Sequence, residues 1–289
     1  CSDDNYLVIN PFFHSFGYKA GWLSALIRGA KVLPVLTFDI DKVLAQIESD
    51  KISMLPGPPT IYQSILAHPK RKDYDLSSLR LAVTGAAAVP VELVNQMWNE
   101  LGFETVVTAY GLTETCGVVT ICRSDDAAEI ISTTSGRAMP GVEVKCVDSE
   151  GVEVATGEPG EICVRGYNVM QGYFDAPEKT AETVDADGWL HTGDVGRLED
   201  DGSLTLIDRK KDIMINAAGK NLSPALIEGV IKASPYIKEV IVIADKRRYV
   251  AALVQLDMDT VRLWAEGQGI VYTNYRSLAE NPAVQILIE

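Results

Sequence analysis

The spacing of apolar residues changes along the chain. In the first stretch it alternates between the spacing of a helix face and that of a strand. Residues 41–49 carry apolar side chains at the spacing of one helix face, and Pro90 occupies a position where another helix can begin. The runs Leu79–Thr84 and Thr105–Tyr110 are short and β-rich, which predicts strands. Helices that alternate with strands predict that residues 1–135 are part of a large layered α/β domain with ligand loops at its strand ends.

The pattern then becomes one of short strands separated by glycines and acidic turns. The runs Val142–Val147, Gly160–Arg165 and Ser203–Ile207 each predict a strand. Between apolar runs, Asp200-Asp-Gly202 is typical of a hairpin turn. We therefore expect residues 136–208 to form a small β-rich subdomain.

A third pattern follows, in which helical and strand spacings mix again. Ser223-Pro224 offers an N-cap and a first-turn proline for a helix. The runs Val240–Ala244 and Val250–Leu256 are typical of strands. A small α+β domain is therefore predicted to begin near Lys211.

The composition is that of a soluble globular protein, with 47% hydrophobic and 23% charged residues. The net charge of −14 argues against a nucleic-acid partner, because binding to a phosphate backbone needs clustered Lys and Arg. The same charge does not exclude a single bound nucleotide, since local donors and a metal ion decide that affinity. No apolar run approaches the ~20 residues of a membrane helix, so we expect no integral membrane segment.

The cysteines are scattered, odd in number and without C-x-x-C spacing: Cys1, Cys116, Cys122, Cys146 and Cys163. Such a pattern indicates reduced thiols and a cytoplasmic protein. We expect Cys116, which adjoins a candidate ligand motif, to be a small buried filler.

Three polar motifs fall in loops between apolar runs. They are Tyr110-Gly-Leu-Thr-Glu-Thr115, Gly188-Trp-Leu-His-Thr-Gly-Asp194 and Asp208-Arg-Lys-Lys-Asp212. A solvated loop or a charged exposed turn would explain each motif taken alone. In this order, the three together predict a nucleotide site.

The residue types in these motifs suit different parts of a nucleotide. Gly111 allows the backbone to approach a ligand closely, and Thr113 offers a hydroxyl to a phosphate. Glu114 provides a hard oxygen ligand for Mg²⁺, which makes Thr113 and Glu114 candidate catalytic residues. Asp194 can accept both hydroxyls of a ribose, and Arg209 can donate to the sugar or to phosphate.

The chain resembles the adenylate-forming superfamily, and within it the acyl-CoA synthetases of the fatty-acid–CoA ligase branch. Further matching segments cover most of the sequence: Pro11-Phe-Phe-His-Ser-Phe-Gly17, Thr84-Gly-Ala-Ala-Ala88, Gly136-Arg-Ala-Met-Pro-Gly141, Gly160-Glu-Ile-Cys-Val-Arg-Gly166, Met170-Gln-Gly-Tyr173 and Gly219-Lys-Asn-Leu-Ser-Pro224. The resemblance implies ATP-dependent activation of a carboxylic acid to an acyl-adenylate, followed by transfer to coenzyme A. It implies ATP or AMP, Mg²⁺ and coenzyme A as cofactors, and the phosphate, metal and ribose roles given above.

The resemblance also places the adenine base. Tyr110 matches a residue that stacks on adenine, while Gly85, Ala86 and Ala87 match small residues whose backbone lies against the base. The alternative interpretation is a buried tyrosine and a tight turn between a strand and a helix.

The C-terminal positions resemble the moving part of the family's enzymes. Lys211, within a hinge at residues 209–212, matches the residue about which the C-terminal domain swings between two half-reactions. Residues 213–289 would then begin that mobile α+β domain. Gly219 and Lys220 resemble the loop that meets the coenzyme A tunnel, although an ordinary exposed turn also explains Lys220.

His14 and Phe16 resemble residues near the acyl-binding pocket, where His14 can gate or polarise the carboxylate. A core histidine is the alternative. Relatives that activate amino acids carry an aspartate near this segment, whereas this chain has no acidic residue from His14 until Asp39. The segment therefore favours a fatty or otherwise apolar acid. An aryl- or amino-acid-activating domain that feeds a carrier protein, a luciferase-type enzyme and a non-catalytic nucleotide-binding remnant are the alternatives.

Two parts that the family would supply are missing from the sequence. No Ser/Thr/Gly-rich phosphate loop ending in lysine precedes Pro11, and the catalytic lysine of the C-terminal domain would lie beyond Glu289. We therefore expect a central piece of a longer enzyme that is inactive by itself, because each missing donor typically costs about 10²–10³ in rate.

Overall fold

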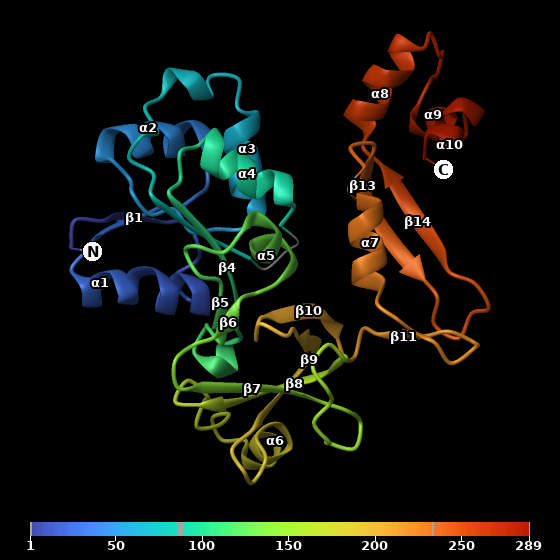
Figure 1. Ribbon diagram of the computed structural model, residues 1–289. Helices are drawn as coiled ribbons and strands as arrows, with labels where there is room; N and C mark the ends of the chain where they lie inside the picture. Colours follow the sequence, from blue (N-terminus) through green and yellow to red (C-terminus); the bar gives the residue numbers. More distant parts are fainter. Residues whose placement is uncertain (1, 86–88, 233, 289) are drawn as a thin grey trace. The chain divides into compact units, whose positions relative to one another are not determined.

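The structure is a computed structural model that describes residues 2–85, 89–232 and 234–288. It divides into two compact units, Cys1–Leu206 and Ile207–Glu289, and the division falls inside one strand (Figure 1). Both units combine helices with several sheets, so the predicted α/β class is confirmed.

Parallel strands form the first layer of the N-terminal unit. They pair as β1 (Asn5–Val8) with β2 (Lys31–Pro34), and as β3 (Leu81–Thr84) with β4 (Thr105–Tyr110). Met54 bridges the pairs through Tyr6 and Leu81. Since β3 and β4 are parallel neighbours, their C-terminal ends lie at the same edge of the sheet, where ligands bind in open α/β folds.

Helices η1 (Phe16–Leu23) and α1 (Ser24–Arg28) follow β1, and they bury only Gly17, Gly21 and Ala25. Four further helices bury apolar side chains in the core of this layer: α2 (Ile40–Asp50), α3 (Pro59–Ala67), α4 (Val91–Asn99) and α5 (Ala128–Thr133). The predicted helix over residues 41–49 is α2, whose Asp39 cap accepts from the Lys42 amide at 3.1 Å. Val43 and Ile47 on its apolar face are fully buried, and burial of such side chains typically contributes ~1.5–3 kcal/mol each.

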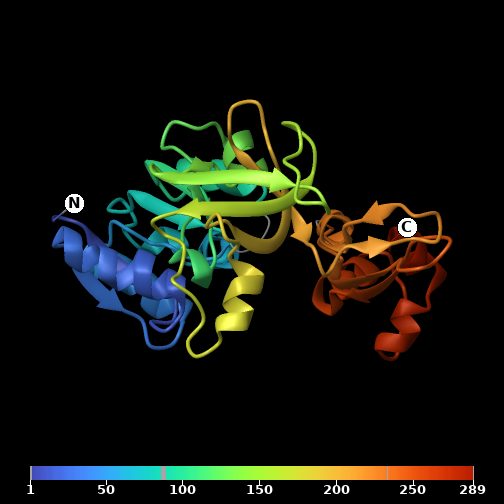
Figure 2. The same ribbon diagram turned by 90° about the horizontal axis from the view of Figure 1, so that it is seen from below.

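Antiparallel strands make up the rest of the first unit. β5 (Thr120–Ile121) and β6 (Arg137–Ala138) extend the β3–β4 pair, and η3 (Thr113–Thr115) lies in the loop between β4 and β5. A separate sheet has the order β10-β9-β8-β7, with strands β7 (Val142–Val147), β8 (Gly160–Gly166), β9 (Leu190–Leu198) and β10 (Leu204–Arg209). Helix α6 (Pro177–Thr183), yellow in Figure 2, contacts β9. Gly202 makes the predicted hairpin turn before β10, at a φ of 79°.

The second unit begins with the end of β10 and contains short strands and helices. Its strands pair antiparallel, β11 (Met214–Ile215) with β12 (Asn221–Leu222) and β13 (Ile237–Ile243) with β14 (Ala251–Leu256). Its helices are α7 (Pro224–Lys232), α8 (Met258–Gly267), α9 (Tyr275–Ala279) and α10 (Pro282–Ile288). Ser223 caps α7, because its hydroxyl accepts from the Leu226 amide at 3.2 Å.

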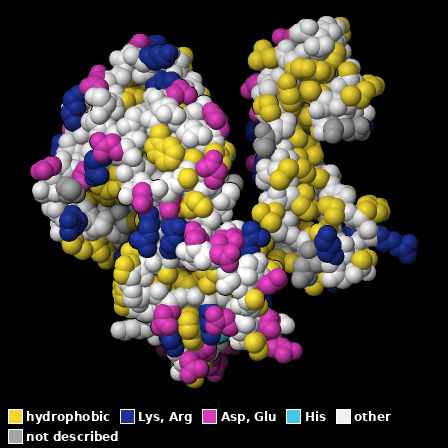
Figure 3. Space-filling view, in the orientation of Figure 1, with side chains coloured by type: hydrophobic (Ala, Val, Ile, Leu, Met, Phe, Trp, Pro, Cys, Tyr) yellow, Lys and Arg dark blue, Asp and Glu magenta, His cyan; other side chains and the backbone are white. Residues whose placement is uncertain are grey.

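Alternate residues of β13 divide between a buried and an exposed face. Val240 and Val242 are buried with side chains of α7, whereas Ile241 and its partner Leu253 on β14 are exposed. Exposed apolar side chains are accordingly visible on this unit in Figure 3. Within the described part of the chain, every helix is too short or too polar to cross a bilayer.

Candidate functional site

The loops that follow β3 and β4 bring two of the sequence motifs together. Gly85 follows β3, and a Cβ atom at this position would lie 3.1 Å from the carbonyl oxygen of Ala109 in β4. A side chain at this position would press closely on the neighbouring strand. Ala86 and Ala87, the other predicted adenine contacts, lie outside the described residues.

The loop after β4 folds back tightly on itself. A Cβ atom on Gly111 would lie 2.2 Å from the carbonyl oxygen of Gly117, so a side chain at this position would break the loop. The Thr115 side chain is buried, while Thr113 is exposed and Glu114 is half-buried. The loop therefore buries one threonine and leaves the two candidate catalytic residues accessible.

Cys116 corrects one expectation from the sequence. It is exposed, with a φ of 55°, rather than a buried filler. The reason is local: the left-handed residue that ends the η3 turn carries its side chain to the surface of the loop.

Residues beyond β8 hold Glu114 in two ways. The Tyr173 hydroxyl donates to Glu114 Oε1 at 2.9 Å, and the Met170 amide donates to the Glu114 carbonyl oxygen at 2.8 Å. Burial and this hydrogen bond raise the pKa of Tyr173, so the phenol stays protonated at neutral pH. The Glu114 carboxylate fits Mg²⁺, which typically takes one or two protein carboxylates and completes its octahedron with phosphate oxygens and water.

A second long-range hydrogen bond joins the nucleotide motif to β9. Tyr110 is only 6% exposed, and its hydroxyl donates to Oδ2 of the buried Asp194 at 2.7 Å. The Asp194 amide donates to Thr192 Oγ1 at 3.1 Å, which fixes the backbone beside the carboxylate. The structure thus brings together two predicted nucleotide-binding residues that lie 84 positions apart. Tyr110 is buried, as in the alternative interpretation, and its stacking on adenine stays a prediction.

The predicted acyl-binding segment lies against the same loop. A Cβ atom on Gly117 would approach the Cβ atoms of Ser15 and Lys19 at 3.7 and 3.6 Å. His14 is exposed, so the alternative of a core histidine is not what the structure shows. Its Nδ1 accepts from the Phe16 amide at 3.2 Å, which leaves Nε2 for other contacts.

Aromatic rings cluster beside His14. The Trp22 ring centroid lies 4.8 Å from that of Tyr18 and 6.1 Å from that of Phe12. The Trp22 indole N–H is buried without a hydrogen-bond partner, which is costly unless a ligand or water accepts from it. Phe12 is 46% exposed, so the cluster offers apolar surface next to the histidine.

The remaining candidates lie in the second unit and are exposed. Arg209 ends β10, and Lys211 follows it in a turn. Gly219 has a φ of 78° in the turn between β11 and β12. The Lys220 amide donates to Asn216 Oδ1 at 2.9 Å, so a local side chain shapes this turn. The roles assigned to these residues stay predictions.

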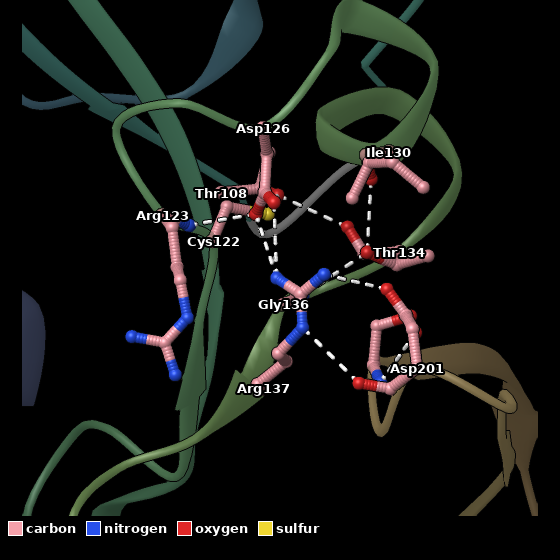
Figure 4. Close-up of polar contacts among 10 residues, drawn as sticks. Thr108, Cys122, Arg123, Asp126, Ile130, Thr134, Gly136, Arg137 and Asp201 are labelled. Carbon is pink, nitrogen blue, oxygen red and sulfur yellow. Dashed lines mark hydrogen bonds and ion pairs between the residues drawn. The ribbon is translucent and has the colours of Figure 1, made fainter.

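Arg137, in the Gly136-Arg motif, ties distant parts of the first unit together (Figure 4). Its guanidinium donates to both carboxylate oxygens of Asp126, at 2.9 and 3.2 Å, and to Asp201 in the β9–β10 hairpin at 2.6 Å. These two ion pairs connect β6 with the loop after β5 and with the β9–β10 hairpin. Neither Arg137 nor Tyr173 is predicted as a site residue by its residue type, although both lie inside matching segments.

Family models match most of the chain. The model described as AMP-binding enzyme matches residues 1–174, and the model described as AMP-binding enzyme C-terminal domain matches residues 211–268.

Curated relatives agree with these matches. A 3-(7a-methyl-1,5-dioxo-octahydro-1H-inden-4-yl)propanoyl:CoA ligase from Rhodococcus jostii is 56% identical over 85% of this chain and 46% of its own length. A ligase of the same name from Mycobacterium tuberculosis is 53% identical over 80% of this chain and 43% of its own length. A feruloyl-CoA synthase from Amycolatopsis is 38% identical over 84% of this chain and 48% of its own length. The chain therefore spans less than half the length of these relatives.

Solved structures share the fold. The O-succinylbenzoate coenzyme A synthetase MenE from Bacillus subtilis, in complex with ATP and magnesium, superposes with a TM-score of 0.76 at 30% identity, over 88% of this chain and 52% of its own. The anthranilate coenzyme A ligase AuaEII, in complex with anthranoyl-AMP, gives a TM-score of 0.78 at 26% identity. The superposition covers 99% of this chain and 51% of the ligase.

Proposed function

Because the chain belongs to the AMP-binding enzyme family, we propose that the protein activates a carboxylic acid with ATP and transfers it to coenzyme A. The carboxylate oxygen attacks the α-phosphorus and pyrophosphate leaves. The thiol of coenzyme A then attacks the acyl carbon and AMP leaves, while the thiol proton passes to solvent. The observation that carries this proposal is the joint placement of Glu114 and Asp194, each held by a tyrosine hydroxyl, around one loop.

Each part of the nucleotide has a candidate partner among these residues. Asp194 accepts the ribose hydroxyls, and Arg209 donates to the sugar or to phosphate. Thr113, exposed in the loop, donates to a phosphate oxygen. Glu114 binds Mg²⁺, which when bound neutralises phosphate charge. Gly85, which has no side chain, lets the adenine base lie against its backbone.

The acid is proposed to be apolar and to lie near His14 and Phe16. The aromatic cluster of Phe12, Tyr18 and Trp22 supports an apolar ring or chain at this place. The relatives named as ligases of the methyl-dioxo-octahydroindenyl propanoyl group are 56% and 53% identical, whereas a putative acyl-CoA synthetase from Bacillus subtilis is 37% identical. We therefore place a fused-ring propanoate ahead of a linear fatty acid.

The thiol step is proposed to depend on the second unit. Lys211, in a hinge at residues 209–212, lets the domain that begins at residue 213 change its orientation between the half-reactions. Gly219 and Lys220 then face coenzyme A. Both are exposed in a turn that Asn216 Oδ1 shapes from within and that the Ala217 amide joins to the Arg247 carbonyl oxygen at 2.8 Å.

We also place the protein in the cytoplasm. Cys116, Cys122, Cys146 and Cys163 are all free thiols. Burial raises the pKa of Cys146 to about 11 and that of Cys163 to about 12, so these thiols stay protonated at neutral pH. Free thiols are typical of a reducing compartment.

The test is a product analysis with the full-length protein. ATP, Mg²⁺, coenzyme A and one acid at a time are incubated, and AMP, pyrophosphate and acyl-CoA are measured by mass spectrometry. The acids are the methyl-dioxo-octahydroindenyl propanoate, linear fatty acids of several lengths, 4-coumarate and amino acids. We expect acyl-CoA from the apolar acids, with the methyl-dioxo-octahydroindenyl propanoate first. Preference for an amino acid would favour the alternative of a domain that feeds a carrier protein, and no acyl-CoA from any acid would contradict the proposal.

A further inference from the structure

Tyr173 touches the nucleotide loop although it lies far from it in sequence. Its hydroxyl donates to Glu114 Oε1 at 2.9 Å, across 59 sequence positions. The Met170 amide separately donates to the Glu114 carbonyl oxygen at 2.8 Å. The main chain at Glu114 therefore has its own support, and the Tyr173 hydroxyl acts on the carboxylate alone.

Tyr173 is itself held in place by the start of α6. Its amide donates to Thr180 Oγ1 at 2.9 Å, and that hydroxyl donates to the Ala176 carbonyl oxygen at 2.9 Å. The Lys179 ammonium lies 4.4 Å from the centre of the Tyr173 ring. Gly172 allows the close approach, because a Cβ atom there would lie 2.8 Å from the Thr180 side chain. A phenol fixed on several sides can hold a flexible carboxylate in one rotamer.

We propose that Tyr173 is a positioning residue for Glu114, holding Oε1 so that Oε2 is the oxygen presented to the Mg²⁺ of bound ATP. This inference rests on the proposed function, in which Glu114 binds the metal. A glutamate without such a partner samples many rotamers, and each must be lost when the metal binds. Groups that hydrogen-bond to metal-binding side chains typically change metal affinity or activity by about 10–100-fold when removed.

The test uses the full-length enzyme and measures metal binding without turnover. Mn²⁺ is titrated by electron paramagnetic resonance in the presence of α,β-methylene-ATP and no acid, and AMP affinity is measured without metal. Tyr173→Phe keeps the ring and the Lys179 contact but removes the hydroxyl. We expect about tenfold weaker Mn²⁺ binding with AMP affinity unchanged. Tyr167→Phe, which removes a hydroxyl from a side chain that is 74% exposed, is the matched control and should change neither.

The same variants are then compared in turnover. Tyr173→Phe should raise the Mg²⁺ concentration for half-maximal pyrophosphate exchange by about tenfold, with the rate at saturating Mg²⁺ within about twofold of wild type. Thioester formation from supplied acyl-adenylate, which needs no ATP-bound metal, should not change. In a Glu114→Gln background, Tyr173→Phe should add no further loss of Mn²⁺ affinity.

The possible failures separate the inference from the proposed function. Unchanged Mn²⁺ affinity in Tyr173→Phe, together with weakened affinity in Glu114→Gln, would overturn the inference and leave the metal role of Glu114 intact. Equal losses of Mn²⁺ and AMP affinity would show a general structural role and would also overturn it. A further tenfold loss in the Glu114→Gln background would show that Tyr173 acts through another group. Unchanged Mn²⁺ affinity in Glu114→Gln would instead refute the proposed metal role itself.

Discussion

The two acidic candidates of the first unit are held by distant parts of the chain, whereas the Lys220 amide of the second unit is held by a residue four positions away. Asp194 and Glu114 each accept a hydrogen bond from a tyrosine hydroxyl, across 84 and 59 positions. Lys220 instead bonds through its amide to Asn216, four residues away, and its side chain is exposed. Lys211 is likewise exposed in a turn.

This difference matches two demands of the proposed reaction. Stabilising the charge that develops on a phosphate needs groups that are fixed before the reaction begins. Presenting a second substrate after the first step needs a segment that can change its orientation. Under the proposed function, the first unit supplies preorganised groups for the first half-reaction, and the second unit supplies groups for the second.

The largest effect is expected from Asp194. In the full-length enzyme, Asp194→Ala should weaken AMP binding by roughly 1–3 kcal/mol, because the ribose loses its acceptor and the hydrogen bond from the Tyr110 hydroxyl is lost. Titration calorimetry measures the affinity. Asp200→Ala, which removes an exposed carboxylate nearby in sequence, is the control. An AMP affinity equal to that of wild type would remove Asp194 from the site.

Lys211→Pro tests whether the second unit must move. Proline fixes φ near −65° and removes the amide donor, so one half-reaction should fall about tenfold more than the other. Pyrophosphate exchange and thioester formation are measured separately. Lys211→Ala, which keeps the amide and its freedom of rotation, should leave both rates nearly unchanged. Equal loss in both half-reactions of the proline variant would count against a hinge.

Tyr110→Phe tests the anchoring of the first unit. Removal of the hydroxyl takes one hydrogen bond from the buried Asp194 carboxylate, which should lower the free energy of unfolding by about 1–3 kcal/mol. Urea denaturation measures the change. The comparison variant is Tyr249→Phe, at a side chain that is 75% exposed, where we expect less than about 0.5 kcal/mol. Equal stability of the two variants would show that the Tyr110–Asp194 bond does not anchor β9.

The smallest structural effect is expected from Lys220. Lys220→Ala removes an exposed side chain, so the free energy of unfolding should change by less than about 0.5 kcal/mol. The KM for coenzyme A should rise severalfold, because a cation near an anionic substrate is lost. Steady-state kinetics with varied coenzyme A measure this change. An unchanged KM would favour the interpretation of Lys220 as an ordinary turn residue.

Local patterns in the sequence were enough to predict most elements that position the site. The strand Thr105–Tyr110 and the strand Val142–Val147 occur where the apolar spacing predicts them. The π-helical geometry of η1 was not predicted, and Gly21 within it leaves helical φ and ψ values. Apolar spacing reports only which face of an element is buried.

The contacts that anchor the site cannot be predicted from apolar spacing. The pairs Tyr110–Asp194 and Tyr173–Glu114 join side chains from separate sheets and loops, so they depend on how the layers pack. The motifs placed Asp194 and Glu114 among the candidates because acidic side chains suit ribose and Mg²⁺. No comparable argument selects Tyr173, because a tyrosine in a loop is compatible with many roles.

The central claim is that residues of the two units serve different half-reactions. It is tested most directly by measuring both half-reactions in two variants of the full-length enzyme. Glu114→Gln should slow pyrophosphate exchange by about 10²-fold and leave thioester formation from supplied acyl-adenylate within about twofold of wild type. Lys220→Ala should show the opposite pattern, with a slower thioester step at low coenzyme A and normal pyrophosphate exchange. If each variant instead slowed both half-reactions to the same extent, the two units would not have separate roles.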